Sequence, residues 1–272
     1  MLRRQYLLKY LRMSKPQLTV VKIGGNVIDN ELALQAFLAD FAALEGYKIL
    51  VHGGGKIATK IAEKLDITAI FHEGRRVTDK PMLDVAVMTY AGLINKDITA
   101  KLQALQNNAI GFTGADGNLI LSEKRKNAGV DFGFVGDVVT VNANLIEVLL
   151  LQDVIPVFSA ITHDGKGQLF NTNADTIAST VAVACSNYFN VNLLYCFEKK
   201  GVLMDSENEE SVIKNLTFEA YQKLREQKVI HSGMLPKLEN CFDALQNGVS
   251  QIGIGSPEML KKDNSIFTLV TA

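Results

Sequence analysis

Two glycine-rich turns near the start of the chain carry the residue types that bind anions. Gly24-Gly25 follows the β-branched apolar run at residues 18–23, and Gly53-Gly54-Gly55 follows a second run at residues 49–51. Glycines at the carboxyl ends of strands expose backbone N–H groups, and a helix that begins there adds the positive end of its dipole. Either turn alone is also explained as a simple tight turn, because short motifs have high false-positive rates.

Lys22 adds a positive charge to the first turn, three residues before Gly25. A charged group is costly to bury without a partner, so a lysine at this place is expected to face a cleft and meet an anion. The alternative is a lysine that reaches solvent from the end of a strand. Point charges beside backbone N–H groups suit phosphoryl transfer, because its catalysis consists mostly of positioning and neutralising the phosphoryl oxygens.

Two other nucleotide-binding motifs compete for the second glycine turn. A Walker-type phosphate loop fails, because Ile57 stands where Ser or Thr is required. A dinucleotide fingerprint fits better, since Gly53, Gly55 and Ala58 have its spacing and Glu73 follows at the distance of a ribose acceptor. An NAD(P)-dependent oxidoreductase is therefore the alternative function, although it leaves Lys22 without a task.

The elements that must position these residues alternate along the chain. Apolar runs at residues 18–23, 49–51, 110–112, 154–158, 191–196 and 251–254 predict strands, and helical patterns lie between most of them. Asp29 is expected to cap the first of these helices, and residues 82–105 carry one long helical pattern. Such alternation predicts an α/β fold with a mainly parallel sheet that helices cover on both faces.

Seven short motifs resemble, in their order and spacing, the amino acid kinase family and within it the acetylglutamate kinases of arginine biosynthesis. The motifs are Lys22-Ile23-Gly24-Gly25-Asn26, His52-Gly53-Gly54-Gly55, Gly74-Arg75-Arg76-Val77-Thr78-Asp79, Gly92-Leu93-Ile94-Asn95-Lys96, Gly133-Phe134-Val135-Gly136-Asp137-Val138, Asn171-Thr172-Asn173-Ala174-Asp175 and Gly233-Met234-Leu235-Pro236-Lys237. The resemblance implies a three-layer α/β/α sandwich with two lobes. Residues 15–180 would form the N-terminal lobe, for N-acyl-L-glutamate binding and dimerisation, and residues 181–272 the C-terminal lobe for ATP, after an extension at residues 1–14.

The resemblance also implies the residues that carry out the transfer. Lys22 and Lys237 would contact the transferring phosphoryl group from opposite sides, and Asp175 would hold their two ammonium groups in position. Gly24 and Gly25 would join the lysines in binding the nucleotide. Asp175 alone is equally explained as an acid in the first turn of a helix, where the helix dipole favours it.

The acceptor end of the site follows from the same resemblance. The N–H groups of Gly25, Gly54 and Gly55 would cradle the reacting carboxylate and phosphoryl oxygens. Arg76 would grip the substrate's α-carboxylate, which a guanidinium can bind through two hydrogen bonds, and Asn171 would add a hydrogen bond there. Taken singly, Arg76 is also surface charge and Asn171 also a turn residue.

The implied reaction moves the γ-phosphoryl group of ATP, in line and without a covalent enzyme intermediate, onto the side-chain carboxylate of N-acetyl-L-glutamate. Another acyl group such as succinyl stays open. No carboxylate cage for a metal is visible, so the ligands of Mg²⁺ are expected to be nucleotide phosphates and water. A homodimer is the expected assembly.

One segment departs from the family pattern. The family usually has a small Thr/Ser-Asp-Val run where this chain has Cys196-Phe197-Glu198-Lys199-Lys200, and Ser232 stands where a glycine is common. Both departures lie in the part expected to hold ATP. Phe197 would either stack on a base or fill core. The departures keep a third hypothesis open, a catalytically silent relative that binds an amino acid and regulates a partner.

Composition limits the remaining function classes. The chain has 272 residues, of which 47% are hydrophobic and 21% charged, with a formal net charge of -1 that argues against a nucleic-acid partner. No apolar run reaches the roughly 18 residues of a membrane helix. Three widely spaced cysteines indicate buried free thiols. The basic residues 1–14 do not resemble a secretory signal, so we expect a cytoplasmic protein with a frayed extension, a start at Met13, or a helix that docks on another subunit.

Overall fold

The computed structural model describes residues 15–72, 75–126, 129–205, 207–227, 229–230, 234–261 and 265–272. The extension at residues 1–14, Glu73 of the dinucleotide fingerprint and Ser232 lie outside these ranges. Within them, no helix has both the length and the apolar character needed to cross a membrane.

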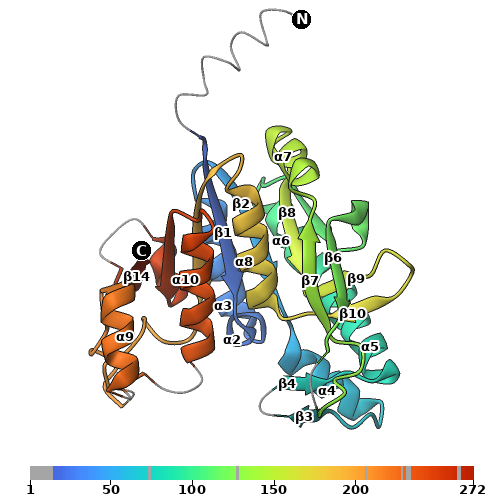
Figure 1. Ribbon diagram of the computed structural model, residues 1–272. Helices are drawn as coiled ribbons and strands as arrows, with labels where there is room; N and C mark the ends of the chain where they lie inside the picture. The colour runs from blue at the N-terminus through green and yellow to red at the C-terminus, as the bar shows by residue number, and fades with distance from the viewer. Residues whose placement is uncertain are drawn as a thin grey trace, which may run out of the picture.

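Eight strands form the central sheet, in the order β12-β14-β13-β11-β1-β2-β8-β5 (Figure 1). The strands are β1 Gln17–Ile23, β2 Tyr47–His52, β5 Ala109–Phe112, β8 Ile155–Ser159, β11 Asn190–Cys196, β12 Asn215–Thr217, β13 Gln251–Gly255 and β14 Thr268–Thr271. All neighbours pair in parallel except β13 and β14, so β12 and β14 run against the other six. The expected mainly parallel sheet is confirmed.

Helices cover both faces of this sheet and complete the expected three-layer α/β/α sandwich. Helices α7 (Ala143–Leu151), α8 (Ala174–Cys185) and α10 (Leu235–Gln246) lie together on the face turned to the viewer in Figure 1, and α3 (Glu31–Ala42) and α6 (Asn95–Ala104) cover the other. Helix α9 (Phe218–Glu226) packs beside β12 at one edge.

The central strand shows why the sequence favours this arrangement. Leu18, Val20, Val21 and Ile23 of β1 are all completely buried, because β11 and β2 flank the strand and helices cover it from both sides. Strands buried on both faces read as continuous apolar runs, as in the sequence of β1. Lys22 interrupts that run one residue before the strand ends.

Smaller sheets carry the acceptor-side residues. Strands β6 (Ile120–Lys124), β7 (Gly136–Val141), β9 (Ile161–His163) and β10 (Leu169–Asn171) form a four-stranded sheet in the order β10-β9-β6-β7, and β3 (Ile70–His72) pairs with β4 (Arg75–Val77) as a hairpin. The sequence analysis did not anticipate β3, β4, β9 or β10, each of only three residues. Arg76 lies on β4 and Asn171 ends β10.

Two local expectations need correction. Asn30, not Asp29, caps α3, since its side chain accepts a hydrogen bond from the Ala33 N–H at 3.0 Å. Asp29 instead ends a short helix, α2 (Gly25–Ile28), that begins directly at the glycine turn. The pattern at residues 82–105 is helical throughout but is three segments: α5 (Lys80–Ala86), a π-helix η2 (Val87–Ile94) and α6.

The remaining helical segments are α4 (Gly55–Lys64) and the 3₁₀ turns η3 (Asp116–Asn118) and η4 (Pro257–Leu260). Helix α4 begins at the third glycine of the second turn, as expected. Residue 180, the expected lobe boundary, lies inside α8, and the division into two lobes stays a prediction.

Candidate active site

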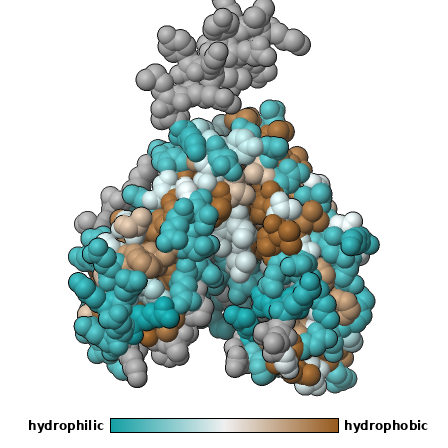
Figure 2. Space-filling view, viewed as in Figure 1, coloured by the Kyte–Doolittle hydropathy of each residue, from teal (hydrophilic) through white to brown (hydrophobic). Residues whose placement is uncertain are grey.

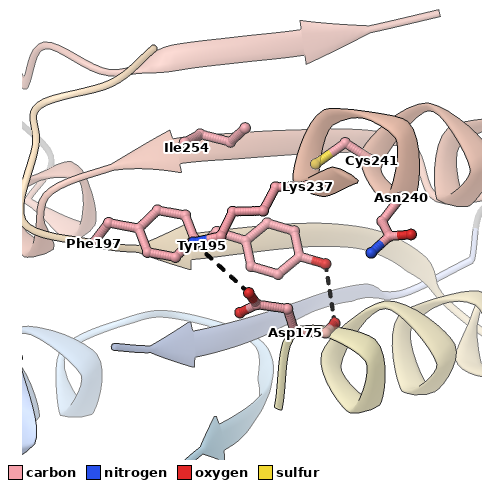
Figure 3. A pocket seen from close by; sticks show the side chains of 7 residues that line it. All are labelled: Asp175, Tyr195, Phe197, Lys237, Asn240, Cys241 and Ile254. Carbon is pink, nitrogen blue, oxygen red and sulfur yellow. Dashed lines mark hydrogen bonds and ion pairs between the residues drawn. The ribbon is translucent and has the colours of Figure 1, made fainter. Parts of the chain in front are cut away.

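Three charged residues from distant parts of the chain meet above the carboxyl end of β1. The Nζ atom of Lys22 lies 2.7 Å from Asp175 Oδ1. The Nζ atom of Lys237 lies 3.9 Å from Asp175 Oδ2, and Figure 3 shows this second pair. One carboxylate therefore lies between two ammonium groups. The cluster carries one net positive charge and can attract an anion.

Each of the three residues is positioned by a secondary-structure element. Lys22 extends from the central strand, while Asp175 and Lys237 lie in the first turns of α8 and α10. The Asn173 side chain caps α8 by accepting from the Asp175 N–H at 2.7 Å, which fixes the turn that carries the carboxylate. Both helices thus direct their N-terminal ends, where partial positive charge collects, toward the cluster.

Burial and neighbouring charges act on Lys237 in opposite directions. Desolvation lowers the pKa of Lys237, the nearby Asp175 carboxylate raises it, and the positive charge of Lys22 lowers it. Lys22 is 9% exposed, so its ammonium depends on Asp175 as its anionic partner. Asp175 therefore offsets part of the cost of holding two cations together.

A cavity of about 390 Å³ opens beside this cluster. It is lined by Lys22, Gly24, Gly25, Asn26, Val27, Lys56, Phe197, Glu198, Lys199, Gly201, Met234, Lys237 and Ile254. Figure 2 shows the molecule hollowed at the lower centre of this face, between the part that carries α9 and the part that carries α4. The cavity brings together all four residues that the family resemblance assigns to the nucleotide, which are the two lysines with Gly24 and Gly25.

The first glycine turn is fixed to the strand next to it. The Gly24 N–H donates to the Cys196 carbonyl at 3.0 Å, and a Cβ atom on Gly24 would lie 3.3 Å from that oxygen. Gly25 begins α2 and lines the cavity. The turn therefore passes close to β11 and presents the start of α2 to the cavity, where its unpaired N–H groups can meet an anion.

The second glycine turn is held by a buried histidine. His52 is completely buried, and its Nδ1 lies 2.8 Å from the Gly53 carbonyl while its Nε2 lies 3.0 Å from Asn95 Nδ2. Both contacts are hydrogen bonds only if Nδ1 carries the proton and Nε2 accepts. Burial lowers the pKa of His52 to about 4, so the neutral ring persists above that pH.

The histidine determines where the next N–H group points. The Gly53 carbonyl and the Gly54 N–H belong to one trans peptide and point in opposite directions. Because His52 draws the carbonyl toward the core, the Gly54 N–H faces away from it. A side chain is excluded at Gly54, since a Cβ atom would lie 2.8 Å from Tyr90 Cδ1 and would also collide with Ile94.

Arg76 reaches the second glycine turn from the hairpin. Its Nη2 donates to the Gly55 carbonyl at 2.9 Å and to Thr59 Oγ1 at 2.8 Å, and its guanidinium lies 4.7 Å from the Phe71 ring centroid. Arg76 is half-buried, whereas its neighbour Arg75 is exposed. The guanidinium is thus fixed beside α4 and is not loose surface charge.

Asn171 joins the same region through Thr78. The Asn171 Nδ2 donates to Thr78 Oγ1 at 3.0 Å, and Thr78 is completely buried two residues after Arg76. The Thr78 carbonyl in turn accepts from the Phe134 N–H at 2.6 Å. Gly133 has φ +70 and approaches the Thr78 carbonyl too closely for a Cβ atom, so this glycine is required by the contact between the two segments.

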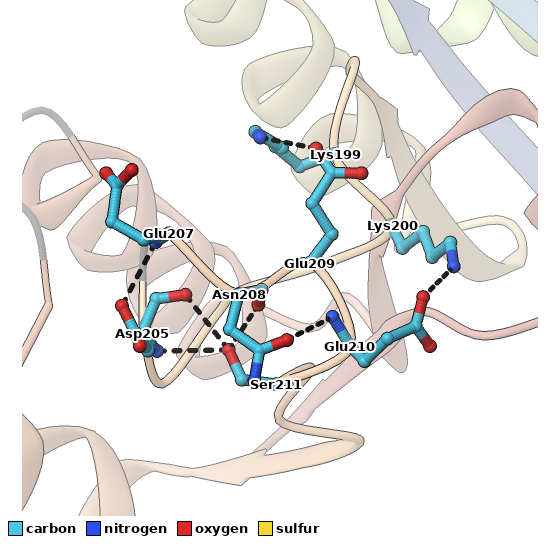
Figure 4. Close-up of polar contacts among 8 residues, drawn as sticks. All are labelled: Lys199, Lys200, Asp205, Glu207, Asn208, Glu209, Glu210 and Ser211. Carbon is cyan, nitrogen blue, oxygen red and sulfur yellow. Dashed lines mark hydrogen bonds and ion pairs between the residues drawn. The ribbon is translucent and has the colours of Figure 1, made fainter.

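The atypical segment after β11 is tied to the acidic loop at residues 205–211. Lys199 and Lys200 form ion pairs of 2.6 Å with Glu209 and Glu210, and the loop is closed by hydrogen bonds from and to Ser211 (Figure 4). Lys199 lines the cavity, yet its ammonium is directed to Glu209. The charge of this lysine is therefore already balanced.

Two residues near the site escaped the sequence analysis. Lys56 lines the cavity in the first turn of α4, and no salt bridge joins it to an acidic residue among the described residues. Its place directly after the third glycine was the signal that could have identified it. Tyr90 lies in the π-helix with its ring against Gly54, and no local pattern predicts that contact.

A metal site built by the protein alone is not found in the part of the chain that the structure describes. No group of three or more His, Cys, Asp or Glu residues in those ranges could hold a metal ion. Asp175, the carboxylate of the charged cluster, is already engaged by Lys22.

Comparisons with known proteins show the family and the fold of this chain. A model of the Amino acid kinase family matches residues 17–256. The chain is 50% identical over 256 residues to an acetylglutamate kinase of Phocaeicola vulgatus, covering 91% of this chain and 100% of that one. It is 52% identical over 246 residues to an acetylglutamate kinase of Cytophaga hutchinsonii, covering 90% and 93%. The structure of a Giardia lamblia carbamate kinase bound to AMP-PNP has the same fold, with a TM-score of 0.70, 12% identity and coverage of 95% and 99%.

Proposed function

Because this chain belongs to the amino acid kinase family, we propose that it transfers the γ-phosphoryl group of ATP to the γ-carboxylate of N-acetyl-L-glutamate, in arginine biosynthesis. The observation that carries the proposal is the pair of ammonium groups held by Asp175 beside a cavity edged by glycine turns. About 50% identity to acetylglutamate kinases over nine-tenths of the chain supports the choice of acceptor.

The reaction balances without any group of the protein changing its covalent state. A γ-carboxylate oxygen of the substrate forms a bond to the γ-phosphorus as the bond from that phosphorus to the β,γ-bridging oxygen breaks. The products are an acyl phosphate and ADP. A carboxylate attacks in its ordinary ionised form and needs no general base, so the buried neutral His52 has no proton to accept from it.

Lys22 and Lys237 are proposed to neutralise the phosphoryl oxygens, with Asp175 holding both. In the transition state, negative charge is spread over the equatorial oxygens of the phosphoryl group and develops on the leaving oxygen. Fixed cations stabilise this negative charge most where water is excluded. The N–H groups of Gly54 and Gly55 are proposed to meet the reacting oxygens from the other side. Mg²⁺ is proposed to arrive as MgATP, with phosphates and water as most of its ligands.

Lys56 connects the nucleotide and acceptor regions. It follows Gly55 in the chain, and its Cγ atom lies 4.0 Å from the position of a Cβ on Gly25. The acceptor region with Arg76 and Asn171 therefore adjoins the cavity through the second glycine turn. The N-terminal lobe is proposed to bind the acyl-amino acid and the C-terminal lobe ATP.

The assay that tests the function supplies MgATP and a panel of acceptors to the full chain. N-acetyl-L-glutamate is expected to yield an acyl phosphate that hydroxylamine traps, while N-acetyl-L-aspartate and free L-glutamate yield little. A faster reaction with N-succinyl-L-glutamate would support the proposed phosphoryl transfer but would identify succinyl as the acyl group of the substrate. Stabilisation by NAD but not by MgATP in a thermal-shift assay would favour the oxidoreductase alternative. Binding of MgATP without turnover of any acceptor would favour the silent regulator.

Arg76→Ala is expected to raise KM for the acceptor by about ten- to a hundred-fold, because hydrogen bonds to a charged carboxylate are lost. KM for MgATP should change little. The matched control is Arg75→Ala on the same strand, whose side chain is exposed. A rise in KM for MgATP alone would remove Arg76 from the acceptor site.

The assembly and location are proposals that rest on the family. We propose a homodimer in the cytoplasm. Apolar surface near one edge of the sheet supports a second copy there, since Met88 and Leu93 of η2 are 55% and 57% exposed and Ile110 lies on the edge strand β5. Sedimentation analysis distinguishes a dimer from a monomer or a larger ring.

A further inference from the structure

The ring of Phe197 is held rigidly under the two lysines. Phe197 directly follows β11, and its N–H donates to the Gly255 carbonyl at the end of β13 at 2.7 Å. Its ring stacks on that of Tyr195, with centroids 6.1 Å apart and planes inclined by 7° (Figure 3). Tyr195 is itself buried and donates from its hydroxyl to the Asp175 carbonyl at 3.2 Å. The ring is thus linked to the residue that holds the lysines.

Both ammonium groups contact this ring. Lys237 Nζ lies 3.9 Å from the ring centroid and Lys22 Nζ lies 5.1 Å from it. Each lysine therefore has the Asp175 carboxylate as one neighbour and the Phe197 ring as another. A cation within about 6 Å of an aromatic centroid is attracted by the negative face of the ring, and more strongly where water is excluded.

We propose, resting on the function proposed above, that Phe197 is a positioning residue that holds Lys22 and Lys237 charged and in place for phosphoryl transfer. One carboxylate balances only one of the two cations, and the ring supplies further negative potential without a formal charge. A second carboxylate there would repel the triphosphate. A ring face also forms no strong hydrogen bond, so the ammonium N–H groups stay free for phosphoryl oxygens.

The alternative role for Phe197 is to stack on the adenine. An adenine on the face that contacts Lys237 would have to displace an ammonium group 3.9 Å from the centroid. The contacts therefore favour support of the lysines, and base stacking becomes one outcome of the test.

The titratable groups around Lys237 determine which ionisation a pH profile of kcat reports. They are Asp175 from α8, Lys22 from β1, Cys241 from α10 and Tyr195 from β11. Burial raises the pKa of Cys241 to about 12 and raises that of Tyr195 well above its ordinary value, so both are neutral in the working range. Glu198 and Lys199 also line the cavity.

Phe197→Leu removes the ring but keeps an apolar side chain, and Phe197→Tyr keeps the ring. In the full-length enzyme we expect Phe197→Leu to lower kcat by about ten-fold, from the size of a desolvated cation–ring contact, with KM for MgATP changed less than three-fold. The ring stabilises charged Lys237, so its loss lowers that pKa further, and the alkaline limb of the kcat profile moves to lower pH. Phe197→Tyr should retain the wild-type kcat and the wild-type position of the alkaline limb in the pH profile.

Each other outcome overturns the proposal. A higher KM for MgATP with unchanged kcat and alkaline limb would show base stacking, and no change would show that the ring only fills space. Equal loss in the tyrosine variant would exclude an effect of the ring. Phe197→Met repeats the test if leucine unfolds the chain, and Phe218→Leu, in the aromatic cluster of α9, controls for general loss of packing. An inactive wild-type chain would refute the proposed function instead.

Discussion

Lys22→Met lowers kcat by about 100- to 1,000-fold if this ammonium stabilises the transferring phosphoryl group, as removal of one preorganised charge does in other enzymes. Methionine retains the length and apolar stem of lysine, so packing in β1 should persist. Asp175 keeps Lys237 as a partner 3.9 Å away, which limits the loss of stability. Steady-state kinetics with N-acetyl-L-glutamate and MgATP measure kcat, and a thermal melt checks the fold.

The control for this change is Lys223→Met, an exposed lysine of α9 that carries no role in the site. It should have wild-type kcat and melting temperature. If Lys22→Met retained more than a tenth of the wild-type kcat in a folded chain, Lys22 would not act on the transition state. The assignment of the cavity to the nucleotide would then lose its main support.

Asp175→Asn is expected to impair both catalysis and folding, because two ammonium groups lose the anion between them. Leaving one member of a buried ion pair unpaired costs about 3 kcal/mol, which corresponds to a decrease in melting temperature of about 6–12 °C for a chain of this size. We expect kcat to fall by at least about 100-fold, since the lysines repel each other out of position. Circular dichroism melts and the kinetic assay measure the two effects separately.

A double variant separates stability from activity at this cluster. Lys22→Met with Asp175→Asn removes the unpaired buried charge, so part of the lost melting temperature should return while kcat stays low. Asp66→Asn, at an exposed position, is the matched control for the change of side chain. Wild-type stability in Asp175→Asn would mean that the two ammonium groups do not need this carboxylate.

The parts of the fold with strong local signals could be predicted from sequence. The apolar run at residues 18–23, with two glycines after it, identifies a buried strand and the turn that follows. The family resemblance is confirmed by a family model that matches residues 17–256. The predicted N-cap of α3 was wrong because Asp29 and Asn30 are adjacent and both residue types cap helices well. The π-helix η2 was missed because its periodicity differs little from that of the α-helices on either side.

The parts of the site that depend on distant neighbours could not be predicted. Phe197 was ambiguous in the sequence, because its contact with Lys22 requires β11 to pair with β1 across more than 170 residues. The hydrogen bond from His52 to the next residue looks local, yet it requires a proton on Nδ1. That tautomer depends on Asn95, a residue distant in sequence whose Nδ2 donates to His52 Nε2. Arg76 and Asn171 lie on three-residue strands, too short for a periodic pattern.

The central sheet has a mechanical consequence for how two substrates can meet. Lys22 lies on β1, between β2 and β11. Strand β2 leads to the second glycine turn, and β11 leads to Phe197. Backbone hydrogen bonds join these three strands, which form the floor of the site, so we expect no hinge between them. We therefore expect the distance between the second glycine turn and Phe197 to stay constant as the substrates bind. Any approach of donor and acceptor must come from parts above that floor, such as the hairpin with Arg76 or the first turn of α10 with Lys237.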